Sequence, residues 1–398
     1  MPGPLDGYKV IDLTQVVSGP LATMLMADQG ASVVKVEPTV GMGDLTRLPS
    51  FDKGGIGAFY LNNNRGKRSL AIDLTSDAGR QVILDMAAEA DVFVQNFRPG
   101  AIERLGLGYD DLVAVNPDII YVSISGYGPD GPYAGRPVLD PVIQGICGVI
   151  GRQVNPQIPF PDLIRNLYAD KSTALTVAQA TTAALLARER GHGGQHVQVP
   201  MVDACMYFFW PDGMMDLTLT DEDANGGILL SSIYNLTETS DGKIVYFAAS
   251  DKQRAGVCAA VGHPEWGEDE RFSSMAALAA NPQNFVLLGE MLADAFREMD
   301  TETVLARLIE EDVPSGPVLS ADEVLVDPQV VHNQTLVEWK HPDAGTVRQP
   351  RPAARFSKTP AAVAESGAHR GQHNAEILAE IGRSEEDIAA LREAGVIP

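Results

Sequence analysis

The chain has 398 residues, a formal net charge of −23, 45% hydrophobic residues and 21% charged residues. This length exceeds what one ordinary hydrophobic core needs, so the sequence predicts two domains with the composition of a globular protein. The large acidic excess argues against nucleic acid and against an anionic membrane surface as partners.

Targeting segments and metal motifs are not evident in the sequence. No apolar run approaches the roughly eighteen residues of a membrane span, and the first residues lack an export signal, so we expect a cytoplasmic protein. The three cysteines stand far apart without C-x-x-C spacing, which predicts reduced thiols. Two histidine pairs have a spacing of four residues but no accompanying carboxylates, and we therefore expect no metal site: His192 with His196, and His369 with His373.

The amino-terminal part alternates short apolar runs with helical patterns. Lys9–Leu13 and Ser32–Val36 are predicted strands, and the run between them is a predicted helix that Ser18 can cap, with Pro20 in its first turn. Such a strand, helix, strand unit starts a parallel sheet, whose ligands gather at the carboxyl ends of the strands.

Two groups of basic residues accompany later strands in this part. Arg65, Lys67 and Arg68 cluster beside a predicted strand and form either a solvated turn or a phosphate contact. Farther on, Asn96–Arg98 ends a strand before a Pro-Gly turn, and the next helix carries Arg104. An amide, an aromatic ring and two guanidinium groups at the carboxyl end of a strand suit an adenine nucleotide with its phosphates.

A glycine-rich stretch follows the strand predicted at Asp118–Ser125. Gly126–Gly131 matches G-x-G-x-x-G, but Pro129 and Pro132 oppose a helix there, and no acid stands about twenty residues on. We therefore reject a dinucleotide-binding fingerprint. The apolar, glycine-rich run Asp140–Gly151 suits close packing beneath a ligand.

The stretch Asn166–Ala204 joins a long predicted helix to a buried strand. The helix runs from Lys171 to Arg190 with apolar residues such as Leu175 at amphipathic spacing, and Asp170 falls in its first turn. Unpaired N–H groups and the helix dipole there should lower the pKa of Asp170. Asp170 is then either a helix cap, the commoner role, or an ionised nucleophile whose neighbouring N–H groups stabilise an oxyanion.

The helical periodicity weakens beyond Ala204, which predicts an exit from the first domain. A hairpin around Asp241–Gly242 opens a second unit, helices dominate Lys252–Asp312, and a capping box at Ser384 and Asp387 precedes a closing helix. We expect the following division: the first part of a large domain at residues 1–205, a linker at 206–240, a small inserted domain at 241–325, and a return linker with the C-terminal part of the large domain at 326–398.

Several segments occur in the same order in a known protein family. The chain contains DLTQVVSGPLATMLMADQGASVVKVEP, NNNRGKRSLAIDL, NFRPGAIERLGL, ISGYGPDGPYAGRP, ADKSTALTVAQATTAALLARERGHGGQHVQVPMVDA and VPSGPVL. Together these resemble the class III (CaiB/BaiF-like) CoA-transferases, a family that includes formyl-CoA transferases, carnitine CoA-transferase and the alpha-methylacyl-CoA racemases. The resemblance spans nearly the whole chain.

The resemblance implies a homodimer of two interlocked, ring-like subunits. Each subunit has a large Rossmann-like α/β domain, on which coenzyme A lies, and a smaller inserted α+β domain. In the transferases an Asp at the position of Asp170 attacks an acyl-CoA and gives a mixed anhydride, then an aspartyl-CoA thioester, then a second anhydride with the acceptor carboxylic acid. The implied partners are an acyl-CoA, a small carboxylic acid and a second copy of the chain.

The resemblance also implies a set of residues for coenzyme A. Asp140 stands where formyl-CoA transferases carry a Glu beside the catalytic pocket, so a supporting catalytic role follows. The CoA-binding positions are Val16, Val17 and Ser18 in the first loop, Asn96, Phe97, Arg98 and Arg104 around the Pro-Gly turn, and Ile72, Leu105 and Met201.

Three departures from the family bear on the reaction. Val17 replaces the Gln of formyl-CoA transferases, and the run at Gly226–Gly227 is shorter than their four-glycine flap, which weakens a formyl/oxalate assignment. Racemases carry a His-Asp pair where this chain has Leu139 and Asp140, so two-base chemistry lacks one partner. A CoA-transferase is expected, with a racemase or a catalytically silent acyl-CoA-binding protein as alternatives.

Overall fold

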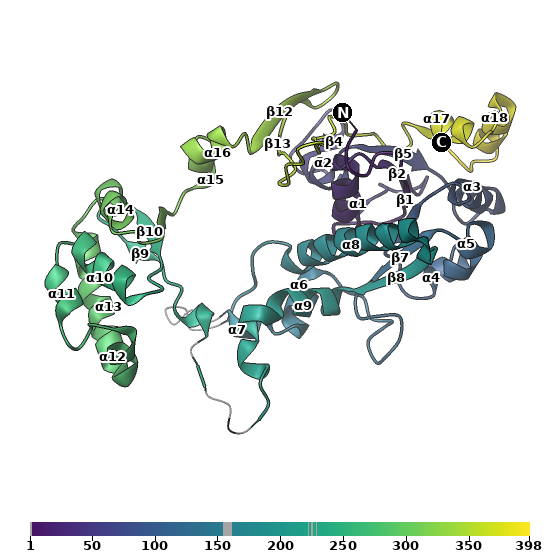
Figure 1. Ribbon diagram of the computed structural model, residues 1–398. Coiled ribbons are helices and arrows are strands. Elements are labelled where there is room, and N and C mark those ends of the chain that lie inside the picture. Colours follow the sequence, from purple (N-terminus) through teal and green to yellow (C-terminus); the bar gives the residue numbers. More distant parts are fainter. Residues whose placement is uncertain (1, 154–160, 222, 224–225, 228) are drawn as a thin grey trace. The chain divides into compact units, whose positions relative to one another are not determined.

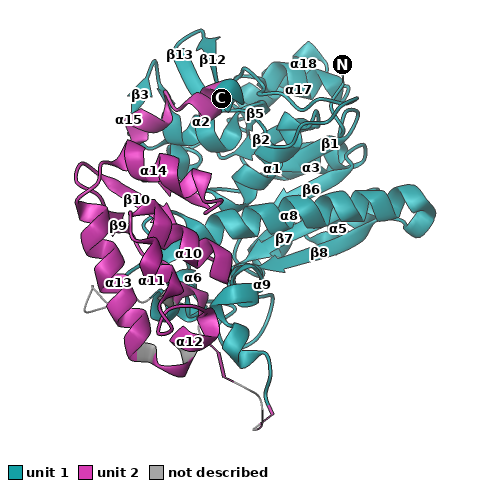
Figure 2. Cartoon of the chain, turned by 60° about the vertical axis from the view of Figure 1, so that its left-hand side comes forward, with its two compact units in different colours: residues 1–220, 332–398 teal, residues 221–331 magenta. Residues whose placement is uncertain are grey.

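The computed structural model describes residues 2–153, 161–221, 223, 226–227 and 229–398. The chain divides into two compact units (Figure 1, Figure 2). The first contains residues 1–220 and 332–398, and the second contains residues 221–331. The chain thus leaves the first unit, builds the second and returns. None of the helices in the described ranges is long and apolar enough to span a membrane.

A parallel sheet of six strands is the centre of the first unit, in the order β5-β2-β1-β6-β7-β8. The chain moves outward from β1 to β5, then crosses to the other side of β1 and continues outward from β6 to β8. β1 and β6 therefore form the switch point, where open α/β sheets bind ligands at their carboxyl ends. The predicted parallel α/β sheet is confirmed. Its strands are β1 Lys9–Asp12, β2 Ser32–Glu37, β5 Lys67–Ala71, β6 Val92–Gln95, β7 Ile120–Ser125 and β8 Gln195–Pro200.

Two hydrophobic cores lie on the two faces of this sheet. Neighbouring strand residues such as Val10 and Ile11 point to opposite cores, as the pleat requires. One face is covered by α1 Ser18–Asp28, α6 Asp140–Ile146, α8 Tyr168–Ala187 and α9 Met201–Gly213. The other is covered by α3 Asp77–Ala87, α4 Ala101–Arg104, α5 Tyr109–Val115, α17 Asn374–Glu380 and α18 Glu385–Glu393.

Smaller elements complete the first unit. They are η1 Leu45–Arg47, β3 Asp52–Lys53, β4 Ile56–Gly57, α2 Ala58–Asn64, α7 Val149–Arg152, a π-turn at Arg188–His192, η3 Met215–Leu217, β12 Leu336–His341 and β13 Gly345–Pro350. The predicted capping box before α18 is present at Ser384 and Asp387. All three cysteines are free and buried.

The second unit combines a small sheet with a helical layer. β9 and β10 pair as the predicted hairpin, β11 pairs with β10, and helices dominate the rest as predicted. Its elements are η4 Leu230–Ser232, β9 Thr237–Glu238, β10 Lys243–Tyr246, β11 Ser315–Pro317, α10 Asp251–Ala260, α11 Pro264–Glu268, α12 Met275–Ala280, α13 Pro282–Arg297, α14 Thr301–Glu310, α15 Ala321–Val324 and α16 Pro328–His332.

Helix α8 differs from the amphipathic helix that the sequence predicts. Leu175 was expected on its apolar face, yet 54% of this residue is exposed. The buried face instead consists largely of alanine, serine and threonine, because α8 packs against α1 and only small side chains permit that approach. Its first turn contains Asp170, as predicted.

The basic cluster beside β5 also differs from both interpretations of the sequence. Arg65 forms a buried ion pair with Asp28 at 2.7 Å, and Lys67 forms one with Asp12 at 2.9 Å. Arg68 pairs with two glutamates of α17. These cations neutralise acids of the same unit, so they form neither a solvated turn nor a phosphate contact.

Buried charges fix the loop between β1 and α1. Asp12 and Lys67 are fully buried, and the Lys67 ammonium also donates to the carbonyl oxygen of Pro20 at 2.8 Å. The carboxylate of Asp12 accepts the N–H of Thr14, while the Lys35 ammonium donates to the Thr14 carbonyl oxygen. Burial alone would raise the pKa of Asp12, but the two ammonium groups hold it below its usual range. The loop is thus tied to a fixed ionic cluster.

Replacing Lys67 with methionine tests this cluster. Lys67→Met leaves the Asp12 carboxylate buried without its main counter-ion, so we expect a loss of about 3–5 kcal/mol in the free energy of unfolding. The matched control is Lys9→Met, whose ion pair with Glu89 is exposed and should contribute less than about 1 kcal/mol. Urea denaturation measures both, and equal effects of the two substitutions would contradict the assignment.

Candidate active site

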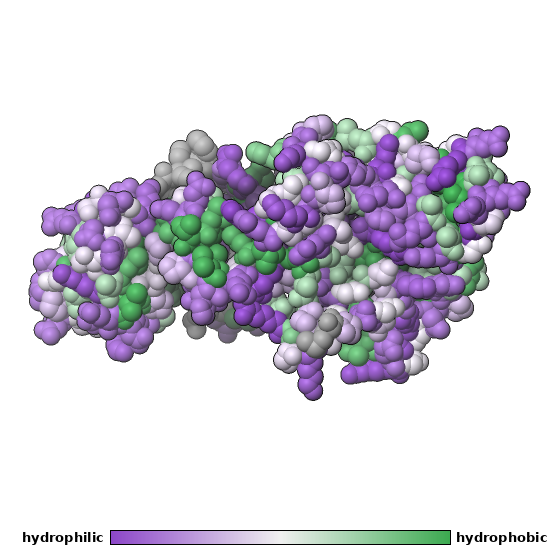
Figure 3. Space-filling model, turned by 90° about the horizontal axis from the view of Figure 1, so that it is seen from above, coloured by the Kyte–Doolittle hydropathy of each residue, from purple (hydrophilic) through white to green (hydrophobic). Residues whose placement is uncertain are grey.

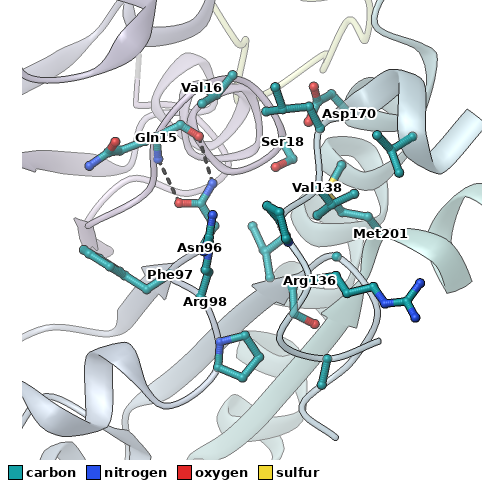
Figure 4. A pocket seen from close by; sticks show the side chains of 18 of the residues that line it. Gln15, Val16, Ser18, Asn96, Phe97, Arg98, Arg136, Val138, Asp170 and Met201 are labelled. Atoms are coloured by element: carbon teal, nitrogen blue, oxygen red, sulfur yellow. Dashed lines mark hydrogen bonds between the residues drawn. The ribbon is translucent and has the colours of Figure 1, made fainter. Parts of the chain in front are cut away.

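A pocket of about 720 Å³ opens at the carboxyl ends of β1, β6 and β7, at the switch point of the sheet (Figure 4). It is built by the loops that follow these strands, by the first turns of α6 and α8, and by the start of α9. Its walls include Gln15, Val16 and Ser18 after β1, Asn96–Pro99 after β6, Ile124–Gly126 at the end of β7, Ala134, Arg136–Leu139 and Val142 around the start of α6, Asp170, and Met201.

The loops after β1 and β6 are bound to each other. The N–H of Gln15 donates to the Asn96 side-chain oxygen at 2.9 Å, and the Asn96 amide donates to the Gln15 carbonyl oxygen at 2.8 Å (Figure 4). Val16 follows with a φ of 70°, which is strained for a β-branched residue. Its N–H donates to the buried carboxylate of Asp44 at 3.2 Å. The hydrogen bonds of Gln15 with Asn96 and of the Val16 N–H with Asp44 therefore hold the strained backbone.

Asp170 and Asp140 lie against each other at one end of the pocket. One Asp140 oxygen accepts the backbone N–H of Asp170 at 2.9 Å, and the other accepts the Gln144 amide at 2.6 Å. Asp140 thus caps α8, and Asp170 does not cap its own helix. Only 5% of Asp170 is exposed, and none of the ion pairs within the described residues includes it. Its carboxylate is therefore buried without a cation.

The pKa of Asp170 is shifted in the direction opposite to the one predicted from the sequence. Burial, followed by the nearby Asp140 carboxylate, raises this pKa from 3.8 to about 6, whereas the helix terminus was expected to lower it. The prediction was wrong because the fold buries this carboxylate and places the negative charge of Asp140, which is distant in sequence, beside it. Asp170 is still mostly ionised at neutral pH, and its charge is poorly solvated.

Ser18 has a different role from the predicted helix cap. Its side chain caps no N–H group of α1. Instead, both its hydroxyl and its backbone N–H interact with the Asp170 carboxylate and lower the pKa of that group. Donors toward the acid therefore come from the start of α1, not from α8 as the sequence suggested. Figure 4 shows Ser18 and Asp170 on the same side of the pocket.

The pocket brings together most of the residues expected to contact coenzyme A. Val16, Ser18, Asn96, Phe97, Arg98, Asp170 and Met201 line it. Asp140 lies behind Asp170 and is buried. The remaining expected residues do not line the pocket. Val17 and Ile72 are buried in the protein. Leu105 packs against the hydrophobic core at the end of α4, and Arg104 is exposed on α4.

Sequence reasoning missed part of the wall between β7 and α6. Arg136, Val138 and Leu139 line the pocket, and so does Val142, which belongs to the run Asp140–Gly151 that was expected beneath a ligand. Arg136 lies over the ring of Tyr133 at 3.7 Å from its centroid. The signal was present in the sequence, since the glycine-rich stretch follows a strand at the carboxyl edge of a predicted parallel sheet.

The chemistry of the walls fits an acyl-CoA. Arg98 and Arg136 are exposed guanidinium groups suited to phosphates, and Phe97 supplies an aromatic ring. Val138, Val142 and Met201 give an apolar surface for a pantetheine arm or an acyl chain. No group of three possible metal ligands occurs in the part of the chain that the structure describes.

Comparison with known proteins identifies the family. A family model described as CoA-transferase family III matches residues 5–374. The chain belongs to CoA-transferase family III. This enzyme is 33% identical to succinyl-CoA:glutarate CoA-transferase of Homo sapiens, with 99% of this chain and 90% of that protein covered. It is 31% identical to formyl-CoA:oxalate CoA-transferase of Shigella sonnei, with 99% of each covered.

A solved structure of the same family agrees with this fold. A CaiB/BaiF family protein from Brucella suis superimposes with a TM-score of 0.82 at 31% identity, covering 96% of this CoA-transferase and all of that chain. The parallel α/β fold is therefore that of family III.

The buried charge of Asp170 gives the CoA-transferase a testable pH dependence. The pKa of Asp170 is about 6 in the folded state against 3.8 as the ordinary value, so stability falls as pH rises through this interval and stays lower above it. We expect Asp170→Asn to raise the free energy of unfolding by about 3 kcal/mol near pH 8 and by about half of that near pH 5.

Urea denaturation at the two pH values measures this gain. Asp110→Asn is the control, because Asp110 is an exposed acid in the first turn of α5 and should change stability by less than about 1 kcal/mol. A variant of Asp170 that is less stable than the wild type near pH 8 would contradict the assignment.

Proposed function

We propose that this enzyme transfers CoA from an acyl-CoA donor to a small carboxylic acid, with Asp170 as the nucleophile. The observation that supports this most is a buried carboxylate without a counter-ion at the end of a pocket whose other wall carries Phe97 and Arg98. A poorly solvated carboxylate with a pKa of about 6 is ionised at neutral pH and more reactive than a hydrated one.

The reaction proceeds through four acyl transfers at Asp170. Asp170 attacks the donor thioester carbonyl carbon, the C–S bond breaks, and Asp170 becomes a mixed anhydride beside the CoA thiolate. Attack of this thiolate on the aspartyl carbonyl carbon releases the donor acid and leaves an aspartyl-CoA thioester. The acceptor carboxylate then displaces the thiolate to form a second anhydride. The thiolate finally takes the acceptor acyl group, Asp170 is a carboxylate again, and no proton is gained or lost.

Asp140 and Ser18 have supporting roles in this proposal. Asp140 holds the backbone of Asp170 through its N–H, and its negative charge disfavours an ionised Asp170, which is neutralised on acylation. The N–H and hydroxyl of Ser18 lie at the Asp170 carboxylate, where they can donate to an oxyanion that develops on the aspartyl carbon. The two groups thus orient the nucleophile and stabilise its intermediates.

We also propose the interlocked homodimer of the family. Exposed apolar side chains support it, because monomers rarely expose many large apolar residues together. In the first unit they include Leu175 and Leu186 on α8 and Tyr207 and Phe208 on α9, with Tyr207 81% exposed. The hydropathy surface in Figure 3 is mostly hydrophilic and carries several apolar patches. A second copy that covers such residues would also complete the acceptor side of the site.

Trapping of the intermediate tests the proposal. The full-length protein is mixed with succinyl-CoA, other short acyl-CoAs or branched acyl-CoAs, then treated with hydroxylamine or borohydride, and the peptide around Tyr168–Lys171 is analysed by mass spectrometry. We expect modification of Asp170 with the productive donor. Asp170→Asn should lower transfer of labelled CoA to acids such as glutarate by about 10⁴-fold or more, whereas Asp110→Asn should retain it.

Other outcomes point to the alternatives. Exchange of the acyl alpha hydrogen in heavy water without CoA transfer would favour a racemase, although the pocket lining contains no histidine. Acyl-CoA binding without either reaction would favour a silent binding protein. Full transfer activity in Asp170→Asn would exclude the proposed nucleophile.

A further inference from the structure

A row of hydrogen-bonded side chains crosses the sheet and ends at the pocket. Its members are Gln95 on β6, Ser123 on β7 and His196 on β8, three strands that lie side by side (Figure 2). Gln95 is directly opposite Ser123, and Ser123 is opposite Gln198, two residues beyond His196. The three side chains therefore project from the same face of the sheet.

The donor and the acceptor of each hydrogen bond in this row can be assigned. The N–H of Phe97 can only donate, and it lies 2.8 Å from the Gln95 side-chain oxygen. The Gln95 amide nitrogen consequently faces Ser123, whose Oγ accepts its N–H at 3.0 Å. The Ser123 proton is then left for Nε2 of His196, 2.8 Å away. We assign the donor role to Ser123, because its Oγ could accept from Gln95 and His196 together only by leaving its own proton unpaired within the row; His196 then accepts at Nε2 and carries its proton on Nδ1.

The surroundings hold the histidine in this form. Its ring stacks on Tyr109 of α5 with the centroids 4.8 Å apart, and the ring of Tyr121 meets it edge-on at 5.1 Å. Burial lowers the pKa of His196 in spite of the nearby acids Glu103 and Asp110. A neutral ring can accept the Ser123 proton, so the chain of bonds is complete at neutral pH.

The row ends where coenzyme A is proposed to bind. We infer that Gln95 is a positioning residue for CoA: held in place by Ser123 and His196, it sets the Asn96–Pro99 turn that lines the pocket. Gln95 is 4% exposed and does not itself line the pocket. It acts through the Phe97 N–H, while Asn96 ties the same turn to Gln15 from the other side. These two hydrogen bonds fix the backbone from which the Phe97 and Arg98 side chains extend into the pocket.

This inference rests on the proposed function only in assuming that CoA occupies the pocket. Gln95→Leu removes the acceptor for Phe97 N–H and the donor for Ser123. We expect its CoA dissociation constant, measured by calorimetry on the full-length protein, to rise about tenfold. KM for the acyl-CoA should rise in proportion with kcat nearly unchanged. Gln81→Leu, at an exposed glutamine of α3, is the matched control and should bind like the wild type.

Gln95→Glu provides a conservative rescue. A carboxylate can still accept the Phe97 N–H, and it can accept the Ser123 proton, so that Ser123 in turn accepts a proton from His196. We expect CoA affinity near that of the wild type but a reversed row. Nitrogen-15 NMR of labelled histidines should show His196 protonated at Nδ1 in the wild type, the minor form of free imidazole in water, and at Nε2 in Gln95→Glu. An unchanged tautomer would show that the row does not connect Gln95 to His196 and would overturn the inference.

Each outcome decides the inference. It is overturned if folded Gln95→Leu binds CoA like the wild type, or if the leucine and glutamate variants lose affinity equally. Should Gln95→Leu fail to fold, Ser123→Ala decides, with about a threefold weaker CoA affinity expected and an unchanged affinity overturning the inference. A wild type that binds CoA but transfers nothing would contradict the proposed function and leave this binding test intact.

Discussion

The hydrogen bond from the Asp170 N–H to the Asp140 carboxylate is the constraint on which the site depends. It joins the first turns of α6 and α8 and thereby places two acids together in a buried environment. A like charge and low solvation raise the pKa of Asp170 to about 6, which leaves it ionised yet poorly stabilised at neutral pH. Acylation neutralises this charge. In the proposed reaction, the contact that orients Asp170 therefore also favours the anhydride.

Buried polar groups also hold the two loops of the pocket that follow β1 and β6. The buried pair of Asp12 and Lys67 fixes the loop after β1, and Asp44 stabilises the strained backbone at Val16. Across the switch point, Gln95 sets the turn after β6. The free energy that these buried groups cost is offset by their hydrogen bonds, so the pocket exists before a ligand arrives. Preorganisation of this kind is what acyl transfer at a weak nucleophile requires.

Local patterns in the sequence were sufficient for much of the fold. The strands of the parallel sheet, the hairpin at Asp241–Gly242 and the capping box at Ser384 follow from neighbouring residues, and the structure contains them. Features that depend on distant residues were not predictable. Lys67 looks like a surface cation until Asp12 is placed beside it, and the pKa of Asp170 reverses once Asp140 is known.

The residues of the candidate site also divide into those that local patterns predicted and those that depend on distant parts of the chain. The turn at Asn96–Arg98 was predicted to lie at the site, because ligands gather at the carboxyl ends of parallel strands, and it lines the pocket. Arg136 belongs to the connection between β7 and α6; the glycine-rich stretch there marked a strand end, but no local pattern showed which of its side chains would face the pocket, and Arg136 was missed. Ser18 was assigned to a helix end that it does not cap, since its partner Asp170 is on another helix.

Oxygen exchange tests the central claim most directly. In the proposed reaction each turnover moves one oxygen from the acceptor acid to Asp170 and one oxygen from Asp170 to the released donor acid. With an acceptor labelled with oxygen-18 on its carboxylate, the Asp170 peptide and the donor acid should both gain label, and no other acidic residue should. If transfer proceeds while Asp170 and the donor acid remain unlabelled, Asp170 is not the nucleophile.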